Sequence, residues 1–479
     1  MLKVKSMQLG SFFDTQKITS AVNFRWLHIS YYSLLLVSTA IGILYGFIFS
    51  EINFPSDRPE WIESLFNTLK LFWLIPFPYA ILNFFSYVRY PVFVRPRQPS
   101  IRSMSQVLYF RYVTRGQNPR LVADVIADSY GVLQDSLPYG NWKLEIVSDN
   151  PLPIDDYDGQ VEVIVVPEDY HPAKGTKYKA RALQYATMAS QARDEDWIIH
   201  LDEETRFDND TVRRIQNFVI DEYLAVRRGL HAMPRIGQGV IIYGRGRIVN
   251  WLTTLADSIR VGDDYGRFRL QYEMGKANMG IHGSFIVINS GVESKIGFDH
   301  GPAASITEDA FFALIAQSQG VEFAFINAFM YEKSPFTVRD FIKQRHRWFG
   351  GLWACALSKD IPFKHRRVLA TFMVMWSVSW LCIAMVFLNM VVPTGTPAWL
   401  AIIGGVSFLY YVTLYVIGFT RTFSMADGRA RFVGLLMLQV ILIPVFSMME
   451  SVSVLYGLIN PPKDFYVVKK ESESVFVTS

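Results

Sequence analysis

The stretch DWIIHLDEET at residues 196–205 joins an apolar, β-branched run directly to three acidic residues. Such a run predicts a buried strand at 197–201. Asp202 would then leave the end of the strand, with Glu204 on the same side two residues later. Carboxylates placed there can hold a hard divalent cation, Mg2+ or Mn2+, that shares its other positions with phosphate oxygens. The alternative is an acidic loop or a helix N-cap.

Predicted strands and helices alternate on both sides of this stretch. The other predicted strands are 107–114, 144–147, 161–166, 239–243, 284–289 and 322–326, and the predicted helices include 119–133 and 177–192. This alternation is typical of an α/β domain with a mainly parallel sheet. Ligands of such sheets bind outside the carboxyl ends of the strands, where Asp202 is expected.

Apolar segments flank this domain. The chain has 479 residues, of which 51% are hydrophobic, and its mean hydropathy is +0.18, which is too apolar for an ordinary soluble enzyme. Segments 27–49, 65–88, 368–392 and 399–420 are each long enough to be transmembrane helices. The sequence therefore predicts an α/β domain inserted between transmembrane helices, so that the lipid bilayer is a partner.

Charge and cysteine content exclude other classes of protein. A net charge of +4 without a basic arm argues against nucleic acid as a partner. Cys355 and Cys382, the only two cysteines, can form neither a disulfide framework nor a cysteine-rich zinc site.

Basic residues near the apolar segments predict the orientation. They are Lys3, Lys5, Lys17 and Arg25 before the first segment and Arg89, Arg95, Arg97 and Arg102 after the second. The loop at 50–61 is acidic. The N-terminus and the inserted domain are therefore expected in the cytosol, with the protein in the Golgi or ER if its source is eukaryotic.

A fifth apolar segment, 432–459, contains Pro444 and Glu450 and has basic residues on both sides. A simple span would conflict with the positive-inside tendency. The segment is predicted to form a re-entrant or interfacial pair of half-helices broken near Pro444, followed by a cytosolic tail. The alternative is an ordinary fifth helix with a buried glutamate.

Two further strings carry chemistry. Thr307-Glu308-Asp309 precedes an apolar run, which indicates acidic residues in the first turn of a helix, where Asp309 could serve as a general base. The string at 344–348, QRHRW, supplies guanidinium groups for phosphate oxygens and an indole that can line a sugar site. A basic patch near the membrane is the alternative for this second string.

The order of the acidic pair, the Thr-Glu-Asp and the Gln-Arg-x-Arg-Trp string resembles family 2 inverting glycosyltransferases. These membrane enzymes have a Rossmann-like GT-A catalytic domain and include cellulose, chitin and hyaluronan synthases. Longer stretches resemble the Egghead group of β-1,4-mannosyltransferases, which make mannosyl-glucosylceramide in invertebrates. Those stretches are KARALQY at 179–185, the strand and acidic residues at 197–205, NWLTTLADS at 250–258 and YEKSPFT at 331–337.

The resemblance implies a role for individual residues. Asp309 would be the catalytic base, and Asp202 and Glu204 would bind the metal, although many relatives have Asp where this chain has Glu204. The implied donor-binding residues are Asp149, Lys179, Arg181, Asp202, Arg345 and Arg347. The implied acceptor-binding residues are Glu308, Trp348, His282, Gly283 and Ser284.

The resemblance also implies a reaction and a division of the chain. The expected reaction is inverting transfer of mannose from GDP-mannose to the glucose of glucosylceramide, forming a β-1,4 linkage. A processive β-glycan synthase that uses a UDP-sugar is the alternative, and a non-enzymatic lipid transporter is a more distant one. The expected parts are membrane region 1–100, GT-A domain 101–345, amphipathic interface segment 346–366, membrane region 367–460 and tail 461–479.

Overall fold

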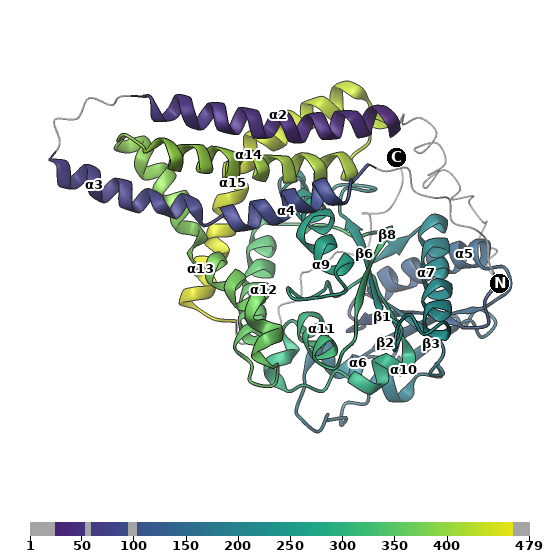
Figure 1. Ribbon diagram of the computed structural model, residues 1–479. Coiled ribbons are helices and arrows are strands. Elements are labelled where there is room, and N and C mark those ends of the chain that lie inside the picture. Colours follow the sequence, from purple (N-terminus) through teal and green to yellow (C-terminus); the bar gives the residue numbers. More distant parts are fainter. Residues whose placement is uncertain (1–23, 53–58, 94–102, 463–479) are drawn as a thin grey trace.

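A computed structural model describes residues 24–52, 59–93 and 103–462. Long helices gather on one side of the molecule, and a sheet with its covering helices forms the other (Figure 1). The predicted tail lies almost wholly outside the described residues, as do Lys3, Lys5, Lys17, Arg95, Arg97 and Arg102.

The sheet has eight strands in the order β3-β2-β1-β4-β7-β6-β8-β5. Their bounds are β1 Leu108–Thr114, β2 Trp142–Ser148, β3 Val161–Val165, β4 Trp197–Asp202, β5 Arg206–Phe207, β6 Ile236–Ile242, β7 Ile286–Asn289 and β8 Phe323–Tyr331. The first four strands in this order are parallel, and β7 is antiparallel to both of its neighbours. The predicted α/β fold with a mainly parallel sheet is confirmed.

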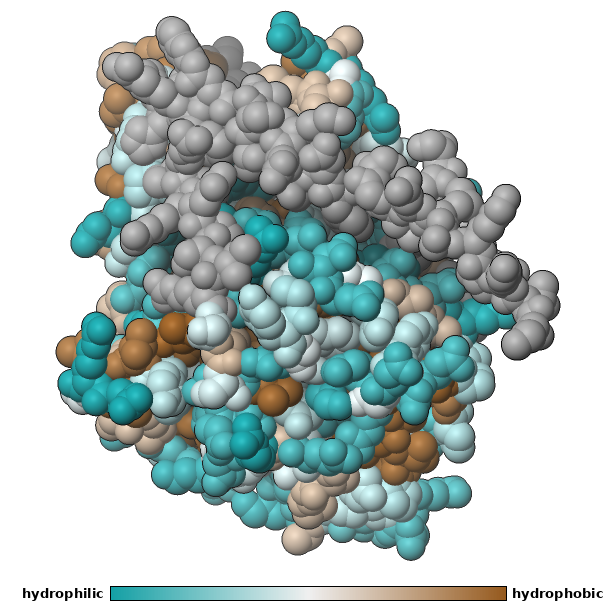
Figure 2. All heavy atoms as spheres, turned by 90° about the vertical axis from the view of Figure 1, so that its right-hand side faces the viewer, coloured by the Kyte–Doolittle hydropathy of each residue, from teal (hydrophilic) through white to brown (hydrophobic). Residues whose placement is uncertain are grey.

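Helices cover both faces of the sheet. Helices α5 (Pro119–Ser136) and α7 (Asn209–Arg227) share one buried apolar cluster with the sheet, and α6 (Tyr178–Ala189), α10 (Ser290–Ile296) and α11 (Glu308–Ser318) share another. Residues at the N-termini of α5 and α7 favour the start of each helix. Helix α5 has a proline in its first turn, and Asp208 caps α7 by accepting a hydrogen bond from the Thr211 N–H. The surface on the side of α5 and α7 is mainly hydrophilic in its lower part, as expected for a domain in water (Figure 2).

The described residues include five helical segments that are long and apolar enough to cross a membrane. They are α2 (Phe24–Ser50), the segment of α3 (Glu60–Leu69), η1 (Lys70–Leu74) and α4 (Phe77–Arg89), and the helices α13 (Phe363–Val391), α14 (Ala398–Thr422) and α15 (Arg429–Ile459). Helices α2 and α14 lie side by side (Figure 1). The chain is therefore a membrane protein.

The fifth segment differs from its prediction. Helix α15 is one continuous α-helix with Pro444 inside it, so the prediction of two half-helices broken near Pro444 is wrong. A proline removes one backbone hydrogen bond, and the other bonds of this long helix keep it continuous. Glu450 pairs with Arg345 of α12 (Val338–Leu357), which explains how a charge is accommodated in an apolar helix.

Three elements connect the sheet to the membrane helices. They are α8 (Trp251–Asp263), the π-helical segment η2 (Asp264–Phe268) and α9 (Arg269–Glu273). Helix α8 packs against α14, and η2 packs against α4. Helix α12 packs against both α13 and α15, and it runs through the boundary expected at residue 345. Two short 3-10 turns, η3 (Pro302–Ser305) and η4 (Met425–Asp427), complete the described elements.

Candidate active site

Lys179, in the first turn of α6, links three segments at the carboxyl end of β4. Its ammonium nitrogen lies 2.5 Å from Asp202 Oδ1, 2.8 Å from the carbonyl oxygen of Gly283 and 3.7 Å from Glu308 Oε1. Burial alone would lower the pKa of Lys179, but the charges of Asp202 and Glu308 raise it above its ordinary value. The lysine is therefore a fixed cation among carboxylates.

Two adjacent carboxyl groups begin α11 beside this lysine. Glu308 is buried and Asp309 is partly exposed, and Asp309 Oδ1 accepts a hydrogen bond of 2.7 Å from the Ala310 N–H. Burial raises the pKa of Glu308 to about 7, and the neighbouring charge of Asp309 adds to the shift while Lys179 opposes it. Burial also raises the pKa of Asp309. Both carboxyl groups therefore keep their protons to a higher pH than exposed carboxyl groups do, a shift that is common among catalytic acids and bases.

Gly283 lies between the base candidate and the lysine. Because β7 is antiparallel to β4, the residues just before β7 lie at the edge of the sheet where Asp202 ends β4. A Cβ atom at position 283 would lie 3.0 Å from Asp309 Oδ2 and 3.5 Å from Lys179 Nζ. Any larger residue would therefore crowd the site, which explains the glycine.

Ser284 belongs to a chain of hydroxyl groups behind the site. Its Oγ lies 3.0 Å from Thr205 Oγ1, which donates a hydrogen bond of 2.8 Å to Glu332. Thr205 Oγ1 also accepts a bond of 3.1 Å from the Asp202 N–H. Sequence reasoning assigned no role to Thr205 or Glu332, because only tertiary structure brings them together.

Asp149 and Arg181 meet at the end of β2. The Arg181 guanidinium lies 3.1 Å from Asp149 Oδ1, and it also donates to the carbonyl oxygens of Pro167 and Tyr170. Asp149 is about one-third exposed. Two of the six residues predicted to bind the donor thus form one pair at the rim of the sheet.

The two arginines of the QRHRW string lie in different surroundings. Arg347 donates a hydrogen bond of 3.2 Å to the Ile306 carbonyl, just before Glu308. Burial lowers the pKa of Arg347, and the charges of Glu308 and Asp309 oppose the shift, so its guanidinium lies near the carboxyl pair. Side chains two positions apart on a helix do not face each other, and Arg345 accordingly leaves α12 elsewhere.

Arg345 is almost completely buried among α8, α12 and α15. It forms ion pairs with Asp257, which is fully buried, and with Glu450 at 3.1 Å. Its guanidinium carbon lies 4.7 Å from the centre of the Trp348 ring, and the guanidinium carbon of Arg260 lies 4.5 Å from it. Arg345 therefore pairs with carboxylates other than those of the candidate site, and the guanidinium groups of Arg345 and Arg260 both lie over the Trp348 ring.

Glu204 is buried instead of lying exposed beside Asp202. The strand ends at Asp202, and a turn closed by the Thr205 N–H to the Asp202 carbonyl oxygen (3.0 Å) interrupts the alternation on which that expectation rested. The charge of Glu204 acts on Lys333, although burial lowers the pKa of Lys333 to about 8. Within the described ranges, no group of three His, Cys, Asp or Glu side chains could hold a metal. A cation here would need ligand oxygens from its substrate besides Asp202.

A small, mostly apolar pocket lies under the carboxyl pair. Its lining includes Gly283, Glu308, Asp309, His200 and Phe312. His200 is buried and pairs with Glu293, which also pairs with Arg111, so this polar group is satisfied inside the domain. The pocket thus adjoins the site from within the core.

The chain is similar to known glycosyltransferases. A family model described as glycosyl transferase family group 2 matches residues 197–420, which include Asp202, the Thr-Glu-Asp and the QRHRW string. The Rossmann-like GT-A sheet and this match define a membrane-bound glycosyltransferase. This result excludes the non-enzymatic lipid transporter.

The relatives define the group more narrowly. The chain is 36% identical to "Beta-1,4-mannosyltransferase egh" of Drosophila melanogaster over 452 residues, which are 91% of this chain and 96% of the fly protein. It is 35% identical to "Beta-1,4-mannosyltransferase bre-3" of Caenorhabditis elegans over 379 residues, which are 78% of this chain and 80% of the nematode protein. The chain belongs to this family of β-1,4-mannosyltransferases.

Solved structures show weaker likeness. The mannosyltransferase PcManGT of Pyrobaculum calidifontis, solved with GDP-Man and Mn2+, is 13% identical at a TM-score of 0.45, covering 82% of this chain and 99% of that one. Residues 1–349 of TarS from S. aureus are 11% identical at a TM-score of 0.31, covering 78% of this chain and 99% of that one.

Proposed function

We propose that this protein transfers mannose from GDP-mannose to the glucose of glucosylceramide and forms a β-1,4 linkage. The observation that carries the proposal is the 36% identity to a β-1,4-mannosyltransferase along 91% of the chain. The site supports it, because a base candidate, Asp309, lies beside fixed cations suited to a departing diphosphate.

The reaction is a single displacement at the anomeric carbon. Asp309 accepts the proton of the glucose 4-hydroxyl while that oxygen forms a bond to C1 of mannose. The bond from C1 to the phosphate oxygen breaks, and GDP leaves with the electron pair. Attack opposite an α-linked nucleotide converts the α configuration of the donor into the β configuration of the product. Glu308 and Asp309 act on each other electrostatically, so the protonation state of Glu308 influences the strength of the base.

Fixed cations stabilise the departing GDP. Lys179 is held at Asp202 and Glu308, and Arg347 lies close to Glu308 and Asp309. Asp202 is the partly exposed carboxylate that would hold Mg2+ or Mn2+ together with the diphosphate, and such a cation, when bound, would neutralise charge on the leaving group. Asp149 and Arg181 bind the nucleoside end of the donor at the neighbouring strand.

Donor and acceptor come from different phases. The catalytic domain faces the cytosol, where the nucleotide sugar is soluble, and the ceramide tails stay among the membrane helices of a Golgi or ER membrane. Trp348 belongs to α12, which contacts both the membrane helices α13 and α15 and the helix α11 that carries Asp309. Its indole is partly exposed, and an acceptor sugar would contact that exposed part.

The test offers the purified full-length protein glucosylceramide with GDP-mannose, UDP-glucose or UDP-N-acetylglucosamine. The expected product, with GDP-mannose only, is a lipid with one added hexose that β-mannosidase removes. Asp309→Asn is the matched negative control. A product made from a UDP-sugar, or a polymer in place of one added residue, would favour the processive synthase and refute the proposal.

A further inference from the structure

The segment η2 interrupts the regular helix between α8 and α9. It is π-helical, and Gly266 within it departs from helical geometry, with φ −87° and ψ −121°. A π segment changes the hydrogen-bond pattern of the backbone and is frequent at functional sites. Its cost must be offset by contacts from neighbouring elements.

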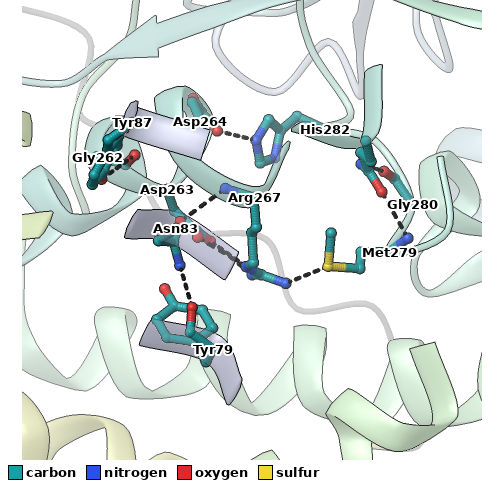
Figure 3. Close-up of polar contacts among 11 residues, drawn as sticks. Tyr79, Asn83, Tyr87, Gly262, Asp263, Asp264, Arg267, Met279, Gly280 and His282 are labelled. Atoms are coloured by element: carbon teal, nitrogen blue, oxygen red, sulfur yellow. Dashed lines mark hydrogen bonds and ion pairs between the residues drawn. The ribbon is translucent and has the colours of Figure 1, made fainter. Parts of the chain in front are cut away.

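Helix α4 of the N-terminal membrane region supplies those contacts through three buried side chains. The Tyr87 hydroxyl donates to the Gly262 carbonyl (2.8 Å), the Ser86 hydroxyl to the Tyr265 carbonyl (3.2 Å), and the Arg267 N–H to Asn83 Oδ1 (2.8 Å). Figure 3 shows the first and third of these bonds. A Cβ atom at position 266 would lie 1.8 Å from Asn83 Oδ1, so α4 fits directly against η2.

The first residue of η2 reaches the candidate site. Asp264 Oδ1 lies 2.5 Å from His282 Nε2 (Figure 3). The imidazole also packs against the Phe268 ring, with 4.7 Å between the ring centroids. The backbone N–H of His282 donates a hydrogen bond of 3.1 Å to Gln238 Oε1. His282 is therefore fixed at its backbone and at its ring, one residue before Gly283, where a Cβ atom would lie 3.0 Å from Asp309 Oδ2.

We propose that Asp264 is a positioning residue: it orients His282, which the resemblance already implies on the acceptor side of the site, so that the imidazole can bond a hydroxyl group of the acceptor sugar. With Nε2–H donated to Asp264, Nδ1 is the ring nitrogen left to bond a ligand. Helix α4 holds this arrangement through Asn83. The inference rests on the proposed function, since it assigns an acceptor contact to the same site.

The first experiment separates acceptor use from donor binding. Asp264→Ala, Asp264→Asn and His282→Ala are purified in full-length form, and incorporation of labelled mannose into lipid is measured together with the Kd for GDP-mannose. Asp264→Ala should lower kcat/KM for the lipid acceptor by about 10–100-fold, the usual effect of losing an orienting hydrogen bond. The Kd for the donor should not change. Asp264→Asn should recover most of the loss, because its amide oxygen still accepts the Nε2–H bond.

A double variant and a helix control complete the test. Asp264→Ala combined with His282→Ala should be no worse than His282→Ala alone, because both changes remove one contact. Asn83→Ala should weaken acceptor use in the same direction, whereas Phe85→Ala, at an exposed position of the same helix, should not. Additive losses, an equal loss of donor affinity, no rescue by Asp264→Asn or normal acceptor use by Asn83→Ala would each overturn the inference.

The same assay keeps the two proposals apart. For the Asp264 and His282 variants, the measured quantity is the labelled mannose incorporated into any lipid of a total lipid extract. If the wild-type protein mannosylates a lipid other than glucosylceramide, the proposed acceptor is wrong, and the variant pattern still decides the role of Asp264.

Discussion

Replacing Arg345 by methionine tests whether this arginine stabilises the fold or binds the donor. In the structure its guanidinium is 2% exposed and pairs with Asp257, which is 0% exposed, and with Glu450, which is 28% exposed. Methionine keeps much of the apolar volume that packs against Phe341, but it removes the cation.

The size of the effect follows from the burial of the two partners. Breaking a buried ion pair by removing one partner costs ~3–5 kcal/mol, because the other charge stays buried and uncompensated. Asp257 is fully buried, and its Oδ2 has no hydrogen-bond partner in the described part of the chain, although Arg260 stays close enough to interact with its charge. Glu450 is more exposed and adds less. We expect Arg345→Met to lose about 3–4 kcal/mol of unfolding free energy.

The assay is thermal unfolding of the detergent-solubilised protein, together with binding of GDP-mannose. Arg345→Met should lower Tm clearly, and adding Asp257→Asn should restore part of the loss because the stranded charge is removed. Arg347→Met is the matched control: it should keep the wild-type Tm and lose donor affinity. An Arg345→Met protein with normal Tm and weak donor binding would refute this reasoning and restore Arg345 to the donor site.

Four further predictions concern the carboxylate site and its rim. Asp309→Asn should lower kcat by about 10²–10⁴-fold, the contribution of a general base, while calorimetry still detects donor binding. Burial raises the pKa of Asp309, and a base works only when ionised, so the transfer rate should begin to fall at a pH above the ordinary titration range of an aspartate. Glu308→Gln removes the neighbouring carboxylate charge and should move this acid limb of the pH–rate profile to lower pH. Asp202→Ala should weaken nucleotide binding in Mg2+ or Mn2+ and abolish its sensitivity to EDTA, and near-normal turnover would contradict the metal role. Trp348→Ala should raise KM for the lipid acceptor more than KM for the donor in steady-state assays.

The sheet could be predicted because its strands are coded locally. Runs such as 107–114 and 161–166 contain enough β-branched and aromatic residues to mark a buried strand. The observed strands begin and end within about three residues of the predicted ones, except that β8 continues to Tyr331 beyond the predicted end at residue 326. β5 has two residues and η2 has five, so neither carries a measurable periodicity. Both depend on partners distant in the sequence: β5 pairs with β8, and η2 packs against α4.

The site could be predicted only as separate strings. Asp202 and Asp309 were recognisable because each marks the boundary of a regular element. The sequence could not show that Lys179 bridges Asp202 and Glu308, since these contacts join residues more than 20 positions apart. The sequence also could not show that Arg345 and Arg347 have different partners. Their side chains point in different directions because they are two positions apart on the helix α12.

Glu450 connects the membrane helix α15 to α12, the helix that carries both arginines. An ionisable residue in an apolar helix usually indicates a functional site. Glu450 instead pairs with Arg345, which lies 105 positions away in the sequence. The pair joins α15 to α12, and two residues further along α12 Arg347 lies beside the base. Because Arg345 also packs against Trp348, a shift of α15 would move the indole and the anchored arginine together. The Glu450–Arg345 ion pair thus links α15 to the helix that carries Arg347 and Trp348, which gives this glutamate a structural role in an otherwise apolar helix.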